Sequence, residues 1–84
     1  MHVTAELSLY PLQEDYIPVI NSFIEQLARA DDITLITNAM STQISGDAER
    51  VFNLVRETLT ASHAHFGRQV LVCKFIPGLL QISD

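Results

Sequence analysis

The chain has 84 residues, of which 48% are hydrophobic and 18% charged, so it has the length of one small domain and the composition of a packed globular protein. This length excludes a two-lobed enzyme with a cleft between domains, and we expect residues 1–84 to form a single domain. Ten acidic residues against five basic ones give a formal net charge of -5, and the basic residues never stand side by side, which argues against a nucleic-acid partner.

The first predicted element is a strand that begins near Val3 and is closed by Pro11. Its residues alternate between an apolar set, Val3, Ala5, Leu7 and Leu9, and a second set, Thr4, Glu6, Ser8 and Tyr10. A period of two is typical of a half-buried strand. We expect the apolar set to face the core, which turns the second set to the opposite, uncovered face of the sheet.

A helix is predicted next, beginning at residues 13–15 and ending before residues 31–32. Asp15 is placed to cap its N-terminus, and Pro18 is tolerated in the first turn, where backbone amides have no partner within the helix. Apolar residues then recur with helical spacing at Ile17, Ile20, Phe23, Ile24 and Leu27.

Residues 33–38 and 41–45 are predicted to be the two strands of a hairpin, joined by a short connection at Ala39 and Met40. A second helix follows, capped by Asp47, and Gly67 stands where a C-terminal residue with positive φ is wanted. The apolar stripe of this helix comprises Val51, Leu54, Val55, Leu59 and Phe66. Residues 70–76 are the fourth predicted strand, and residues 79–82 are apolar but too few to assign.

The order strand, helix, strand, strand, helix, strand is that of a ferredoxin-like βαββαβ sandwich, an α+β fold. In this fold each helix connects two strands of one sheet by a right-handed crossover. We therefore predict a four-stranded antiparallel sheet with both helices on one face.

The sheet face that the helices leave uncovered is predicted to be partly apolar. Residues 70–76 are apolar on both faces apart from Lys74, and strands of this kind are usually covered on both sides. We therefore expect a homodimer or homotetramer formed through a sheet face or edge. A pocket between the polar residues of the first strand and a second subunit would be a natural ligand site.

No residue pattern indicates catalysis, a metal or a cofactor. His63 and His65 point about 200° apart on a helix and cannot chelate one ion together, and Cys73 stands in an apolar run as a small buried residue. No apolar run approaches the length of a membrane span, and the first nine residues lack the pattern of a signal peptide. We expect a cytoplasmic, non-enzymatic protein without a membrane partner.

Residues 37–47 form a polar stretch around the predicted hairpin turn. Its side chains that donate and accept hydrogen bonds include Asn38, Ser41, Thr42 and Gln43. These residues alone leave two interpretations open, an ordinary polar hairpin and a small-molecule site. Strict alternation from Ile44 would turn Thr42 toward the helices unless a bulge or the end of the hairpin freed it.

Residues 41–46, Ser-Thr-Gln-Ile-Ser-Gly, resemble the Ser-Thr-x-hydrophobic-x-Gly signature of the YkoF-like thiamine-binding family. Residues 5–12 resemble that family's first strand, which also ends in a proline turn, and residues 70–75 stand where its late strand is expected. The resemblance implies ferredoxin-like domains, found as single-domain oligomers or tandem repeats, that bind thiamine or its hydroxymethylpyrimidine part without catalysing a reaction. A single domain departs from the tandem form, so oligomerisation would have to restore the pairing.

With this resemblance, the predicted ligand-binding residues are Glu6, Ser8, Tyr10, Asn38, Met40, Ser41, Thr42 and Gln43. Glu6 would face the thiazolium cation or bond a ring nitrogen, while Tyr10 or Met40 would pack against a ring. The alternative for Glu6 is an ion pair with a lysine or arginine across a subunit interface.

The predicted function is non-catalytic binding of thiamine or a related hydroxymethylpyrimidine-type molecule, as a carrier, buffer or sensor. The alternative is a structural or regulatory interaction module without a small-molecule ligand.

Overall fold

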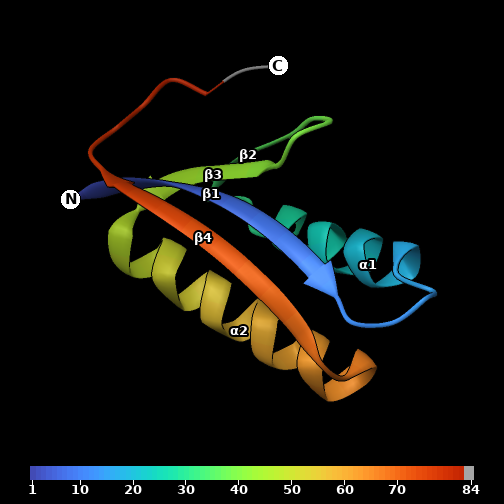
Figure 1. Cartoon of the computed structure of the whole chain (residues 1–84). Coiled ribbons are helices and arrows are strands. Elements are labelled where there is room, and N and C mark those ends of the chain that lie inside the picture. Colours follow the sequence, from blue (N-terminus) through green and yellow to red (C-terminus); the bar gives the residue numbers. More distant parts are fainter. Residues whose placement is uncertain (83–84) are drawn as a thin grey trace.

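The computed structural model describes residues 1–82 and contains six elements. They are β1 (His2–Pro11), α1 (Ile17–Ala28), β2 (Thr34–Thr37), β3 (Thr42–Asp47), α2 (Ala48–Phe66) and β4 (Gln69–Pro77). The strands form one sheet in the order β2-β3-β1-β4, with every neighbouring pair antiparallel. Both helices lie against the same face of this sheet (Figure 1). The predicted ferredoxin-like sandwich is confirmed.

The core lies between the sheet and the helices, and alternation along β1 predicted its central residues. Val3, Ala5 and Leu7 are buried under the helix layer, whereas Leu9 is only half-buried. The helices contribute Val19, Phe23, Leu27, Val51, Leu54 and Val55 to the same layer. The hydrophobic stripe of α2 was therefore predicted correctly in its first half.

The start of α1 was predicted wrongly. The helix begins at Ile17, its cap position is Tyr16, and no side chain caps it, so Asp15 is not the cap. Residues 12–16 instead form a turn, in which the Tyr16 N–H donates to the Glu14 carbonyl (3.0 Å) and the Gln13 side chain donates to the Asp15 carbonyl (2.9 Å). The buried line of the helix is Val19, Phe23 and Leu27, so Ile17, which was assigned to the apolar stripe from the sequence, is instead 56% exposed.

The ends of α2 follow the prediction. The Asp47 carboxylate accepts a hydrogen bond from the Arg50 N–H (3.3 Å), as an N-terminal cap does. At the other end Gly67 has a φ of 97° and donates its N–H to the His63 carbonyl (2.9 Å). A positive φ favours glycine over any residue with a side chain.

Residues 79–82, which were not assigned from the sequence, lie over the uncovered face at the β2–β3 side (Figure 1). The Leu80 N–H donates to the Thr4 hydroxyl (3.3 Å), which also lies 3.2 Å from the Ser45 hydroxyl. Thr4 is therefore only 5% exposed, although it points away from the helices. The expectation that all four alternate residues of β1 lie on an open surface is wrong for Thr4.

Candidate functional site

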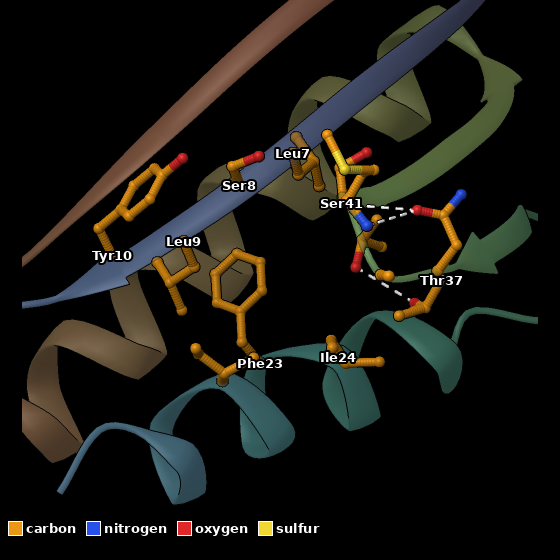
Figure 2. Close-up of a pocket in the computed structure, with 13 residues that line it drawn as sticks. Leu7, Ser8, Leu9, Tyr10, Phe23, Ile24, Thr37 and Ser41 are labelled. Carbon is orange, nitrogen blue, oxygen red and sulfur yellow. Dashed lines mark hydrogen bonds between the residues drawn. The ribbon is translucent and has the colours of Figure 1, made fainter.

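A cavity of about 230 Å³ opens between the end of β1, helix α1 and the β2–β3 hairpin (Figure 2). It lies on the helix side of the hairpin and at the edge of the sheet. Its wall on β1 consists of residues 7–10, its wall on α1 consists of Ile20, Phe23 and Ile24, and its third wall is residues 37–42.

The strand pairing explains why the sheet is open at this point. Within residues 1–82, the pairing of β1 with β3 ends at Leu7 and Thr42, whereas its pairing with β4 continues to Pro11 and Gln69. One edge of residues 8–10 therefore has no strand partner in the described part of the chain. Backbone N–H and C=O groups on such an edge are free to bind a ligand.

The floor of the cavity is apolar. Phe23 is buried and points from α1 toward β1 (Figure 2). Ile20 and Ile24 are half-buried on the same helix. A floor of this kind suits the face of a flat ring.

Thr42 reaches the cavity from the helix side of β3, as strict alternation from Ile44 predicts. It is buried, and its hydroxyl lies 3.2 Å from the Thr37 hydroxyl across the hairpin. The hydroxyl pair lies at the base of the hairpin wall. Each hydroxyl can both donate and accept a hydrogen bond, so the pair can bond either a donor or an acceptor atom of a ligand.

The tip of the hairpin is held by Asn38. Its side-chain oxygen accepts hydrogen bonds from the N–H groups of Met40 (2.9 Å) and Ser41 (3.2 Å), and its own N–H donates to the Ser41 carbonyl (3.1 Å). This is the local turn chemistry that asparagine commonly provides. The Asn38 amide nitrogen remains available as a donor, and Met40 is 87% exposed at the rim.

The structure brings six of the eight predicted binding residues to this cavity: Ser8, Tyr10, Asn38, Met40, Ser41 and Thr42. Glu6 and Gln43 lie outside it, opposite each other in the β1–β3 register on the sheet face away from the helices. Glu6 also has a partner in its own chain, because the Lys74 ammonium lies 3.7 Å from its carboxylate.

Sequence reasoning missed the apolar half of the cavity. Ile20, Phe23 and Ile24 were assigned to the core stripe of the helix, and Thr37, although part of the polar stretch, was not among the predicted binding residues. The predicted strand lengths could have indicated the opening in the sheet, because the predicted first strand is longer than either strand of the hairpin. A long strand beside a short hairpin leaves part of its edge unpaired.

The lining of the cavity is neutral: no charged side chain contributes to it among residues 1–82. Over the same residues, no group of three or more histidine, cysteine, aspartate or glutamate side chains is placed to hold a metal ion. Burial raises the pKa of the Cys73 thiol, which disfavours the thiolate that reacts as a nucleophile. No helix in the described part of the chain is long and apolar enough to cross a membrane.

Comparison with protein families shows that residues 2–75 match the YKOF-related family. No curated protein matches the sequence.

Several solved structures share the fold. A protein of Streptococcus pneumoniae superposes with a TM-score of 0.83 at 18% identity, covering 95% of this chain and 90% of its own. A protein of Thermotoga maritima, named provisionally for thiamine biosynthesis or salvage, superposes with a TM-score of 0.81 at 22% identity, covering 89% of this chain and 82% of its own. A hypothetical protein of Methanocaldococcus jannascii gives a TM-score of 0.79 at 24% identity, covering 99% of this chain and 87% of its own.

Proposed function

The chain belongs to the YKOF-related family, and we propose on this premise that its cavity binds thiamine or a related hydroxymethylpyrimidine-type molecule without converting it. The observation that carries this proposal is the combination of an apolar floor with a neutral hydrogen-bonding wall beside an unpaired strand edge. The provisional name of the Thermotoga maritima neighbour is consistent with it. The protein would then act as a carrier, buffer or sensor.

An aminopyrimidine ring fits these walls chemically. One face of the ring would lie against Phe23, with Tyr10 at the rim. Its edge carries an amino donor and ring-nitrogen acceptors, which the Thr42 hydroxyl, the Asn38 amide and the strand edge at residues 8–10 can complement.

The cavity favours the pyrimidine part of thiamine over its cationic thiazolium. No charged side chain among the described residues lines it, and the nearby Glu6 carboxylate already faces Lys74. The volume of about 230 Å³ lies below the roughly 300–1,000 Å³ of sites for drug-sized ligands, and suits one substituted ring. In a thiamine complex, the thiazolium would extend toward solvent or a neighbouring subunit.

A second candidate function, a structural or regulatory interaction module, rests on the face of β4 that points away from the helices. Val70, Val72 and Ile76 are 45–50% exposed there. Isolated exposed apolar residues are common, but a row along an edge strand is typical of a surface that associates. We propose homodimer or homotetramer formation through this surface for either function.

The Thr42→Val variant tests the binding site, because valine keeps the shape of threonine and removes its hydroxyl. We expect isothermal titration calorimetry to show a loss of roughly 5- to 150-fold in affinity for hydroxymethylpyrimidine, the range for a hydrogen bond lost from a desolvated site. Thr34→Val is the matched control, since Thr34 lies on the same hairpin but outside the cavity.

Two outcomes would contradict this proposal. A wild-type protein that binds neither hydroxymethylpyrimidine nor thiamine, and that neither ligand stabilises against heat, would remove the binding function. A Thr42→Val protein with wild-type affinity would show that the ligand binds elsewhere. A larger loss of affinity in His63→Ala would show the same, because His63 lies on α2 outside the cavity.

A further inference from the structure

Ser41 connects the two faces of the sheet. It lines the cavity on the helix side, while its hydroxyl donates a hydrogen bond to the Glu6 carboxylate (3.0 Å) on the opposite face. The other carboxylate oxygen of Glu6 lies 3.7 Å from the Lys74 ammonium of β4. A chain of contacts therefore runs from β4 through β1 to the tip of the hairpin.

Among residues 1–82, backbone pairing joins the hairpin tip to β2 and β3 but not to β1, so its position against β1 depends on this connection. The pairing of β3 with β1 ends at Thr42, and Ser41 is the next residue toward the hairpin tip. The hydrogen bonds of Asn38 shape the tip internally and do not join it to β1. In the described part of the chain, the side-chain hydrogen bond that joins the tip to β1 is the one from Ser41 to Glu6.

We propose that Glu6 is a positioning residue, which holds the hairpin wall of the cavity through Ser41 and does not itself touch the ligand. This inference rests on the proposed function, since the wall matters only if the cavity is occupied. It differs from the role expected from the sequence, in which Glu6 faces a cationic ligand directly. Glu6 lies outside the lining of the cavity, and its charge is opposed by Lys74.

The two roles of Glu6 predict different results for two substitutions. In Glu6→Gln the side-chain amide oxygen can still accept the Ser41 hydroxyl, whereas in Glu6→Ala no acceptor remains. Positioning predicts a loss of roughly 10-fold in affinity for Glu6→Ala and recovery to within about 3-fold of wild type for Glu6→Gln. Positioning also predicts equal losses for thiamine and hydroxymethylpyrimidine, because the wall contacts the part they share.

A double-mutant cycle with Ser41→Ala isolates the connection. If Glu6 acts through Ser41, Glu6→Ala costs no further affinity once the Ser41 hydroxyl is absent, so the two effects are strongly non-additive. Glu57→Ala, an exposed glutamate on α2 far from the cavity, is the matched control and should bind as wild type. Calorimetry with both ligands measures all variants.

A second readout needs no ligand. The N–H groups of Met40 and Ser41 lie in the tip, and amide exchange measured by NMR should accelerate there in Glu6→Ala and not in Glu6→Gln. Unchanged exchange in Glu6→Ala would overturn the inference.

Four binding outcomes would contradict one or the other proposal. Additive losses in the cycle, or a Glu6→Gln variant that loses thiamine while keeping hydroxymethylpyrimidine, would mean that Glu6 contacts the ligand and would overturn positioning. Wild-type affinity in Glu6→Ala would overturn it as well. A wild-type protein that binds neither ligand would instead overturn the proposed function, and with it any ligand role for Glu6.

Discussion

Thr58 has a buried hydroxyl with an unmet hydrogen-bonding capacity. Thr58 is fully buried in α2, and its Oγ1 atom has no hydrogen-bond partner in the described part of the chain. A hydroxyl removed from water without a partner costs about 1–3 kcal/mol. The position therefore carries a polar atom that destabilises the fold.

We expect Thr58→Val to raise the free energy of unfolding by about 1 kcal/mol, because valine has nearly the same shape and a similar helix propensity. Urea denaturation measures the change. Thr60→Val is the control on the same helix: Thr60 is exposed and its hydroxyl donates to the Arg56 carbonyl (2.7 Å), so little change is expected. A destabilised Thr58→Val protein would show that the hydroxyl is satisfied, for example by a buried water.

At the scale of single residues, the candidate site was only partly predictable. Alternation correctly places Glu6 away from the helices and Thr42 toward them, and in the structure Thr42 lines the cavity whereas Glu6 does not. The sequence could not show where the β1–β3 pairing ends, because that depends on how the hairpin bends away from the sheet. The apolar floor at Phe23 could not be recognised from the sequence either, because core residues and pocket residues of a helix recur with the same spacing.

The helix ends show how local chemistry decides element boundaries. Asp15 and Asp47 both precede an apolar helical stripe, yet only Asp47 accepts a backbone hydrogen bond as a cap in the structure. Asp47 ends a strand that leads directly into α2, whereas Asp15 lies in a turn that precedes α1. The strand holds Asp47 in an extended conformation (φ -59°, ψ 134°), which is the backbone conformation of a cap residue, whereas the cap position of α1 is Tyr16.

Asp47→Ala tests this difference and should lower the free energy of unfolding by about 1 kcal/mol. Asp15→Ala is the control, and it should leave stability nearly unchanged because the Asp15 side chain caps nothing. Chemical denaturation of both variants makes the comparison. If Asp47→Ala keeps its stability but loses ligand binding, Asp47 belongs to the binding site and its capping role is minor.

Gly46 links the sequence signature to packing between elements. A Cβ atom at this position would lie 2.6 Å from the Ile33 Cδ1 atom and 3.7 Å from the Val51 Cγ2 atom. The glycine thus lets β3 approach the segment that enters β2 and the first turn of α2. The signature that indicated the family therefore includes one residue whose role is packing, at the opposite end of β3 from the cavity.

At the scale of the whole molecule, the sheet face away from the helices divides into two parts. Residues 79–82 lie over the part around Thr4 and Ser45, which are both buried. The part formed by Tyr10, Val70 and Val72 remains exposed, and Tyr10 pairs with Val70 in the β1–β4 register. It is formed by the end of β1 and by β4, and β4 is the strand at one edge of the sheet.

An exposed edge strand with apolar side chains is a surface on which two copies can pair. We expect sedimentation at micromolar concentration to show a dimer or tetramer of the 9.4 kDa chain, and Val72→Lys to shift it toward the monomer. In a symmetric interface the new lysine would stand close to its own copy, adding like-charge repulsion to lost apolar burial. Ile17→Lys is the matched control, because Ile17 is comparably exposed but lies on the helix layer. A wild-type monomer, or equal dissociation by both lysine variants, would show that this face does not mediate association, and the exposed row on β4 would then be ordinary surface.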